Sequence, residues 1–132
     1  MPNNTGIPSW KSVRFFESAI ATHTAVESVT NRGENEFVIN RKIHTPVVVY
    51  LTDVYTVGIA DVIDAMTRIP DLSCVVTISN WNGYTQAAKD HGIQNHVGIF
   101  LFAELMGALN QDDICTYVKH DKDGKPVYHC RG

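Results

Sequence analysis

Four side chains near the C-terminus are of types that bind zinc or form disulfides: Cys115, His120, His129 and Cys130. Their spacing, C-x₄-H-x₈-H-C, matches no common zinc module. They flank the turn signal Asp121-Lys122-Asp123-Gly124, which predicts a β-hairpin. On that hairpin the two cysteines would lie nearly opposite one another, while the two histidines would point to the other face. The pattern favours a plain hairpin that covers a sheet edge or pairs with another subunit, and a disulfide only in an oxidising setting.

A second candidate is Trp81, in the polar segment Ser79–Gly83 that follows an apolar run. Open α/β sheets usually place ligands at the carboxyl ends of their strands. The indole could stack on a nucleobase or a partner, or it could pack beneath the neighbouring helix. Hydrolase and nucleotide-binding chemistry have little support, because the sequence contains neither a G-x-S-x-G elbow nor a glycine-rich phosphate loop.

The elements that must position these residues are indicated by three near-continuous apolar runs. Such runs are typical of strands covered by helices on both faces. The runs are Pro46–Leu51, Cys74–Ile78 and Val97–Phe102. A turn-forming cluster between two segments rich in β-branched residues, Ala25–Thr30 and Glu36–Asn40, predicts an antiparallel hairpin before the first run.

Helical periodicity fills the intervals between the strands. The helices are expected over Ser12–His23, Ile59–Ile69, Gln86–Asp90 and around Leu105–Leu109. In the second helix, Ile59, Val62, Ile63 and Met66 should form the buried face. Thr85 is the expected N-cap of the third helix and Gly92 its C-cap. The predicted order is α-β-β-β-α-β-α-β-α, an α/β fold.

Composition limits the classes of function. A net charge of −3 argues against a generally basic nucleic-acid binder, although a local basic patch could still exist. No apolar run approaches the ~20 residues of a membrane span, and Met1–Ser9 does not read as a secretory signal. An odd count of three cysteines, with Cys74 in a buried strand, fits a reducing cytoplasm.

Three segments in this order resemble the Mrr-like branch of the PD-(D/E)XK restriction-endonuclease-like superfamily. They are Phe16-Glu17, Val57-Gly58-Ile59-Ala60-Asp61-Val62, and Thr77-Ile78-Ser79 with Gly83-Tyr84-Thr85-Gln86-Ala87-Ala88-Lys89. The resemblance covers about Ser12 to Leu109. It implies a three-layer α/β/α domain over residues 1–110, with the hairpin of residues 111–132 packed on the same domain.

The resemblance also implies a magnesium site that this chain has altered. In that family an acid on the second strand and a Glu/Gln-x-Lys pair on the third bind Mg²⁺ and position a water for phosphodiester hydrolysis. Glu36 falls at the position of the acid. The other two positions become Tyr50 and Thr52, and neither residue is a good ligand for a hard cation or carries a positive charge. We therefore expect no metal to bind.

Relocated residues could restore the site. Asp53 could turn into it beside Glu36 and Glu17 if the strand bulges, and a lysine could arrive from Lys42 or Lys89. The alternative interpretation is that these three acids are ordinary solvated surface residues.

Three functions follow. The first is a non-catalytic module with a nuclease-like fold that binds DNA or RNA weakly, or a protein partner, without a cofactor. Arg32, Arg41 and Lys42 would then hold phosphates, and Trp81 would be a contact residue. The second is a Mg²⁺-dependent DNA nuclease with relocated catalytic residues. The third is a small homo-oligomeric interaction protein of the kind that mobile elements encode, which uses the tail hairpin and Trp81 as contact surfaces.

Overall fold

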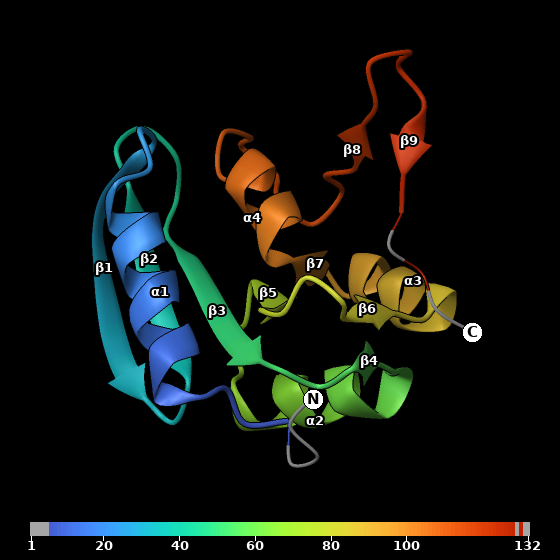
Figure 1. Ribbon diagram of the computed structural model, residues 1–132, viewed down its shortest axis with the longest axis horizontal. Coiled ribbons are helices and arrows are strands. Elements are labelled where there is room, and N and C mark those ends of the chain that lie inside the picture. The colour runs from blue at the N-terminus through green and yellow to red at the C-terminus, as the bar shows by residue number, and fades with distance from the viewer. Residues whose placement is uncertain (1–5, 129, 131–132) are drawn as a thin grey trace.

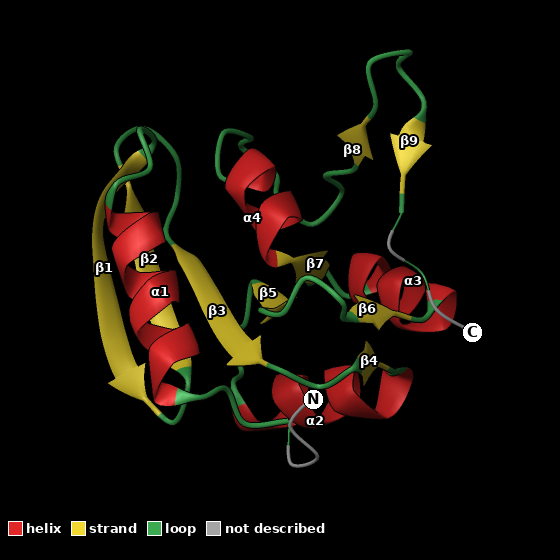
Figure 2. Cartoon of the chain, in the orientation of Figure 1, coloured by secondary structure: helices red, strands yellow, loops and turns green. Residues whose placement is uncertain are grey.

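The protein is described by a computed structural model that covers residues 6–128 and residue 130. A mixed five-stranded sheet lies at its centre, with helices on both faces (Figures 1 and 2). The sheet strands are β1 (Val26–Gly33), β2 (Glu36–Arg41), β3 (Val47–Thr52), β5 (Cys74–Thr77) and β7 (Gly98–Leu101). The helices are α1 (Trp10–Ala21), α2 (Ile59–Arg68), α3 (Gln86–Gln94) and α4 (Phe102–Ala108).

The sheet order is β1-β2-β3-β5-β7. The pairs β1–β2 and β2–β3 are antiparallel, whereas β3–β5 and β5–β7 are parallel. The first apolar run is therefore an interior strand that runs parallel to the second. Helices α2 and α3 make the crossover connections that parallel neighbours require.

Two apolar clusters pack on opposite faces of the sheet. Odd-numbered residues of β3, such as Val49, pack with residues of α1 and α4, including Phe16 and Leu105. Even-numbered residues, such as Val48, pack with residues of α2 and α3, including Val62 and Ala88. This alternation decides on which face each candidate site residue lies.

The first hairpin differs from the prediction because its turn is shorter. Strand β1 continues to Gly33, and the turn consists of Glu34 and Asn35, both with positive φ (54° and 64°). Positive φ at both central residues is the geometry of a type I′ hairpin turn. Arg32, expected in the turn, is therefore a strand residue.

Helix boundaries also differ from the prediction. Helix α1 begins at Trp10, because Ser9 is its N-cap and its hydroxyl accepts a hydrogen bond from Ser12 N. Thr85 caps α3 as predicted. Gly92 lies inside α3 and is not its C-cap, because the helix continues to Gln94.

The buried face of α2 was predicted only in part: Val62 is buried and the partly buried Met66 packs against the same cluster, but the other two predicted residues are exposed. Ile59 and Ile63 are 39% and 47% exposed, while Val62, Ala65 and the following Ile69 are buried. The fully buried residues Val62, Ala65 and Ile69 thus follow the spacing i, i+3 and i+7. Ile59 and Ile63 lie outside this stripe. Alanine carries little weight in an apolar pattern, yet Ala65 is fully buried in the apolar cluster on this face of the sheet.

Short strands complete the fold. Strands β4 (Thr56–Val57) and β6 (Gly83–Tyr84) form a small parallel sheet that the sequence did not predict. In the tail, β8 (Lys119–His120) and β9 (Pro126–Val127) pair antiparallel, as the turn signal predicted. Figure 1 shows this hairpin extending away from the body. In the described part of the chain, no helix has both the length and the apolar character needed to cross a membrane.

Candidate functional site

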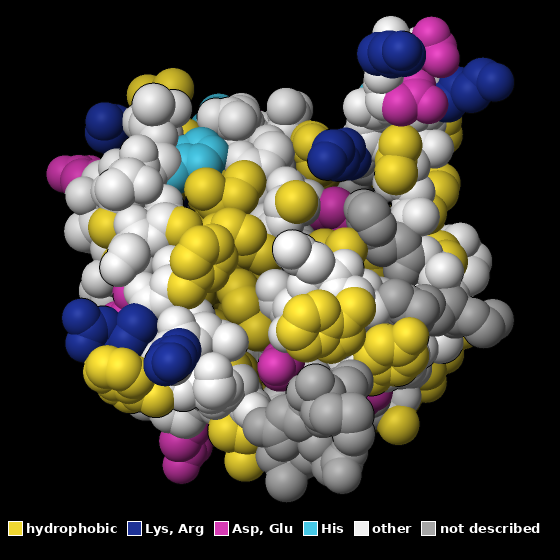
Figure 3. Space-filling view, viewed as in Figure 1, with side chains coloured by type: hydrophobic (Ala, Val, Ile, Leu, Met, Phe, Trp, Pro, Cys, Tyr) yellow, Lys and Arg dark blue, Asp and Glu magenta, His cyan; other side chains and the backbone are white. Residues whose placement is uncertain are grey.

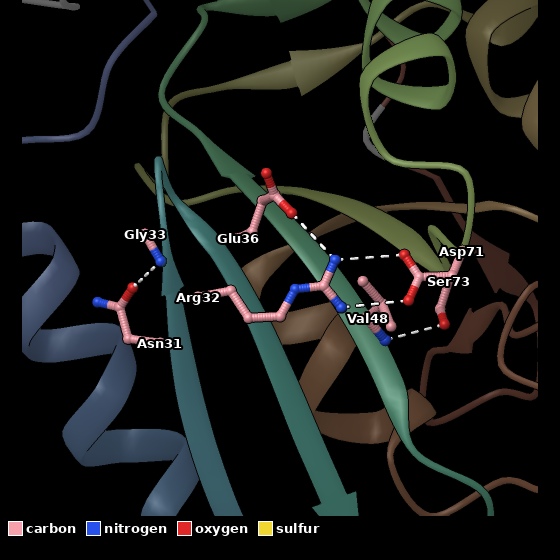
Figure 4. A network of polar contacts seen from close by, with 7 residues as sticks. All are labelled: Asn31, Arg32, Gly33, Glu36, Val48, Asp71 and Ser73. Atoms are coloured by element: carbon pink, nitrogen blue, oxygen red, sulfur yellow. Dashed lines mark hydrogen bonds and ion pairs between the residues drawn. The ribbon is translucent and has the colours of Figure 1, made fainter.

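The position expected to hold a metal ligand on β2 belongs instead to an arginine-centred ion-pair network (Figure 4). Glu36 lies directly opposite Tyr50 in the β2–β3 register. The Arg32 guanidinium donates to Glu36 Oε1 at 3.1 Å and to both carboxylate oxygens of Asp71, at 3.1 and 3.3 Å. This hydrogen bonding lowers the pKa of Asp71 and raises that of Arg32. The protein's own cation thus bridges two carboxylates at this position.

Tyr50 is covered by a second arginine. The Arg68 guanidinium lies 4.9 Å from the centre of the Tyr50 ring, a cation–π distance, and also pairs with Asp64 at 3.3 Å. Hydrogen bonding to Tyr50 raises the pKa of Arg68. Tyr50 is therefore a packing partner of helix α2.

The N-terminal segment lies against the carboxyl end of β3. The carbonyl of Gly6 accepts hydrogen bonds from the Thr52 hydroxyl and from Asp53 N, both at 2.9 Å. Gly6 has φ +72°, and a Cβ there would lie 2.9 Å from Val54 Cγ2. Only glycine combines this backbone conformation with such a close approach. The Thr52 hydroxyl, at the position of the family's lysine, is thus committed to the protein's own backbone.

Asp53 belongs to a buried polar cluster at the ends of β3 and β5. Asn82 Nδ2 donates to Asp53 Oδ1 at 2.7 Å and to Thr77 Oγ1 at 2.8 Å. All three side chains are at least nine-tenths buried. Asn82 Oδ1 is a buried polar atom without a hydrogen-bond partner among the described residues. The carboxylate of Asp53 is therefore held by an amide donor.

The three acids proposed as relocated metal ligands lie in separate places. Glu17 is on α1, which covers the sheet face opposite to that of the Arg32 network. Glu36 pairs with Arg32, and Asp53 with Asn82. Within residues 6–128 and 130, no group of three or more His, Cys, Asp or Glu side chains could hold a metal ion.

Lys89, proposed as a relocated lysine, is 1% exposed. Its ammonium donates to the carbonyl of Ile99 at 2.6 Å and lies 4.5 and 5.0 Å from the ring centres of Phe100 and Tyr84. Burial lowers the pKa of Lys89, an effect that nearby Glu104 opposes. This lysine stabilises the packing of α3 on β7.

The basic residues proposed to hold phosphates are also in different environments. Arg32 is paired with two acids, as described above. Arg41 is 6% exposed and donates to four backbone carbonyls, those of Thr45, Leu109, Gln111 and Asp112. Burial lowers its pKa. Of the three, Lys42 alone is exposed and outside such a network among the described contacts.

Trp81 is 51% exposed, so about half of its surface is open to solvent. It lines a groove of about 310 Å³ between the first turns of α1 and the end of β5. Lys11 and Phe15 form the α1 side, and Ile78 to Trp81 form the other side. We call this feature the aromatic groove. On the face drawn in Figure 3, apolar side chains gather near the middle, and both basic and acidic side chains lie beside them.

The tail does not bring its cysteines together. Cys115 donates its thiol hydrogen to Asp113 Oδ1 at 3.1 Å, whereas the backbone of Cys130 forms an isolated parallel β-bridge with Tyr84 of β6. All three cysteines are free thiols. His120 lies on β8, and His129 lies outside the described residues. The regular hairpin that would place Cys115 opposite Cys130 does not extend to them, because β8 and β9 pair only Lys119 with Val127 and His120 with Pro126.

Sequence reasoning missed Asn82 and Asp71, which hold Asp53 and Arg32. One signal was available for Arg32: Glu34-Asn35 is a two-residue turn, and recognising it would have made Arg32 a strand residue. No local pattern indicated Asp71, which is 39 positions away. Comparison with known proteins adds no assignment, since no family model, curated protein or solved structure matches this chain.

Proposed function

We propose that this protein is a non-catalytic module of restriction-endonuclease-like topology that binds nucleic acid. The observation that carries the proposal is the Arg32 bridge, in which a guanidinium occupies the space between Glu36 and Asp71. Carboxylates that already neutralise an arginine are poor ligands for Mg²⁺, which needs their oxygens. Tyr50 and Thr52, at the other two positions, are also engaged by the protein itself.

The topology supports the nuclease-like part of the proposal. A helix, three antiparallel strands, a crossover helix and a parallel strand follow one another in the chain, and β3 lies between β2 and β5. The acid of β2 and the two altered positions of β3 lie on the same sheet face, as a shared site in the resembling family would require. Fold alone does not determine function, so the site residues carry the argument.

The aromatic groove supports the nucleic-acid part. Exposed aromatic rings beside lysine and arginine are the combination with which proteins hold nucleic acids without reading a duplex. Because the net charge is −3, few cations contribute and binding should be weak and sensitive to salt.

The test has two parts. Purified protein is incubated with supercoiled plasmid, linear duplex and single strands in Mg²⁺ and in Mn²⁺, and gel shifts are measured at low and moderate salt. We expect a shift at low salt and no cleavage. An Arg32→Ala variant, which frees both carboxylates, should also fail to cleave because Tyr50 and Thr52 remain. Nicking by the wild type that is lost in Asp53→Ala would overturn the proposal in favour of a nuclease.

A further inference from the structure

We propose that the aromatic groove binds single-stranded nucleic acid, with unpaired bases stacked on Trp81 and Phe15 and phosphates held by Lys11 and Arg14. This inference rests on the proposed function and names its site and its class of ligand. It is argued from three features: exposed rings, positive charge in a groove whose described lining contains no carboxylate, and the order of these groups along α1.

The first feature is the exposure of aromatic rings on one surface. Trp10, Phe15 and Trp81 are 70%, 55% and 51% exposed. Phe15 and Trp81 line the same groove, and Trp10 lies on the adjacent side of α1. Scattered apolar residues are normal on a surface, but large aromatic rings gathered on one face indicate a contact site.

The second feature is the charge of the α1 N-terminus. The first turn of α1 contains no acidic residue, although acids are favoured there by the helix dipole. It contains Lys11 instead, and Arg14 follows one turn later with its guanidinium 5.1 Å from the centre of the Trp10 ring. The described residues that line the groove include no carboxylate. Dipole and side chains therefore add to a positive field that favours an anionic ligand.

The third feature is the order of these groups along the helix. Lys11 and Phe15 are four residues apart, as are Trp10 and Arg14. Each pair therefore lies side by side on the helix and combines one positively charged side chain with one aromatic ring. Trp81 and the apolar Ile78 line the same groove as Lys11 and Phe15. A strand whose bases enter between rings while its phosphates follow the two cations fits this pattern, whereas a duplex presents no unpaired base to stack.

The chain provides its own reporter for this site, because its two tryptophans are Trp10 and Trp81. Unlabelled oligothymidylate and oligouridylate of about twelve nucleotides, and the corresponding duplex, are titrated while tryptophan emission is measured. We expect both single strands to change the emission and the duplex to bind more weakly. With two phosphate contacts, the logarithm of the affinity should fall with the logarithm of the salt concentration with a slope of about −1.4.

Variants locate the site. Trp81→Ala should weaken single-strand binding by about fivefold or more, and Trp81→Phe, which keeps a ring, should restore most of it. Lys11→Ala should reduce the salt slope by about 0.7. Lys122→Ala and Ile63→Ala are matched controls, a lysine and an apolar residue exposed elsewhere, and should bind as the wild type does. A thermal melt of each variant serves to check that it is folded.

The outcomes separate the two proposals. Binding that leaves tryptophan emission unchanged and survives both Trp81→Ala and Lys11→Ala would overturn the groove while leaving the proposed function intact. Tighter binding of the duplex would overturn the single-strand assignment. If no oligonucleotide binds even at low salt, both the groove and the proposed function are wrong, and the exposed rings serve protein contacts.

Discussion

Two buried charged side chains, Arg41 and Glu104, have hydrogen-bond partners for their charged groups. Arg41 donates to backbone carbonyls in the segment after α4, where the negative end of the helix dipole lies. Glu104 is 1% exposed and accepts from the Tyr84 hydroxyl and from Leu101 N, both at 2.8 Å. We interpret both charges as structural. Removing one partner would leave the other group buried without a hydrogen bond, which costs stability.

The amide of Asn82 should be essential for stability. Asn82→Ala removes both donors from Asp53 and Thr77 and leaves a buried carboxylate without its partner, so we expect the free energy of unfolding to fall by about 1–3 kcal/mol. Urea denaturation measures this change. The exposed Asn80→Ala is the control and should have little effect. Equal stability of Asn82→Ala and wild type would mean that Asp53 is hydrated.

We expect ionisation of the Cys115 thiol to lower the stability of the protein at alkaline pH. Burial, together with its hydrogen bond to Asp113, raises the pKa of Cys115 to about 11, from an ordinary 9.0. Because the folded pKa is the higher one, the stabilisation is fully present below pH 9 and is lost as the pH rises through 11. The loss should be on the order of 2 kcal/mol for this thiol.

Denaturation curves of wild type and Cys115→Ser at pH 8 to 11 isolate this contribution, since serine keeps a hydroxyl donor for Asp113. The difference in stability between the two proteins should narrow as the pH rises. Parallel curves for the two proteins would show that the thiol titrates normally. Cys74, whose pKa burial also raises, remains in both proteins and cancels in the comparison.

At the level of elements, the close contact between α3 and β7 depends on a residue without a side chain. Gly92 lies in the last turns of α3, and its backbone approaches Val97 and Ile99. The same helix contributes Lys89, whose ammonium binds the carbonyl of Ile99. Glycine inside a helix costs about 1 kcal/mol relative to alanine, so a packing reason must outweigh this cost.

Gly92→Ala should therefore destabilise the protein in spite of the gain in helix propensity. An added Cβ would overlap the carbonyl oxygen of Val97 and lie 2.8 Å from Ile99 Cγ1, and backbone atoms cannot easily move away. We expect a net loss of about 1–3 kcal/mol, measured by thermal denaturation. Gly58→Ala is the control, because the nearest atom to its added Cβ lies 3.7 Å away. A gain in stability for Gly92→Ala would contradict the close packing.

At the scale of the whole molecule, burial is greatest in three strands of the central sheet. Strands β3, β5 and β7 are almost entirely buried, whereas every residue of β8 is exposed and β9 is at most partly buried. The segment before β8 is nevertheless attached to the body, since the Tyr117 ring lies 6.4 Å from that of Phe100. The tail thus combines a packed stem with an exposed hairpin (Figure 1).

Amide hydrogen exchange should reproduce this division. The amides of β3 and β5 should exchange only through global unfolding, while those of Lys119–Val127 should exchange through local opening with little protection. Mass spectrometry of peptic fragments over a time course measures both groups. Slow exchange in the hairpin would contradict this expectation and would point to pairing of that hairpin with another subunit.

Local patterns in the sequence determined the α/β class, the strand positions and several turns. The apolar runs that became β3, β5 and β7 are continuous, so their burial on both faces follows from composition alone. The N-cap of α3 and the turn after His120 were equally clear, because one side chain bonds the backbone within a few residues.

Only the tertiary structure decided which charges meet. Arg32 and Asp71 are 39 positions apart, Asp53 and Asn82 are 29 apart, and Arg41 binds carbonyls about 70 positions away. No periodicity or cap relates residues at such separations, because their approach depends on how α2 crosses the sheet and how the chain returns after α4. The residue types that could have bound a metal were therefore visible in the sequence, whereas their engagement by arginine, amide and backbone groups was not.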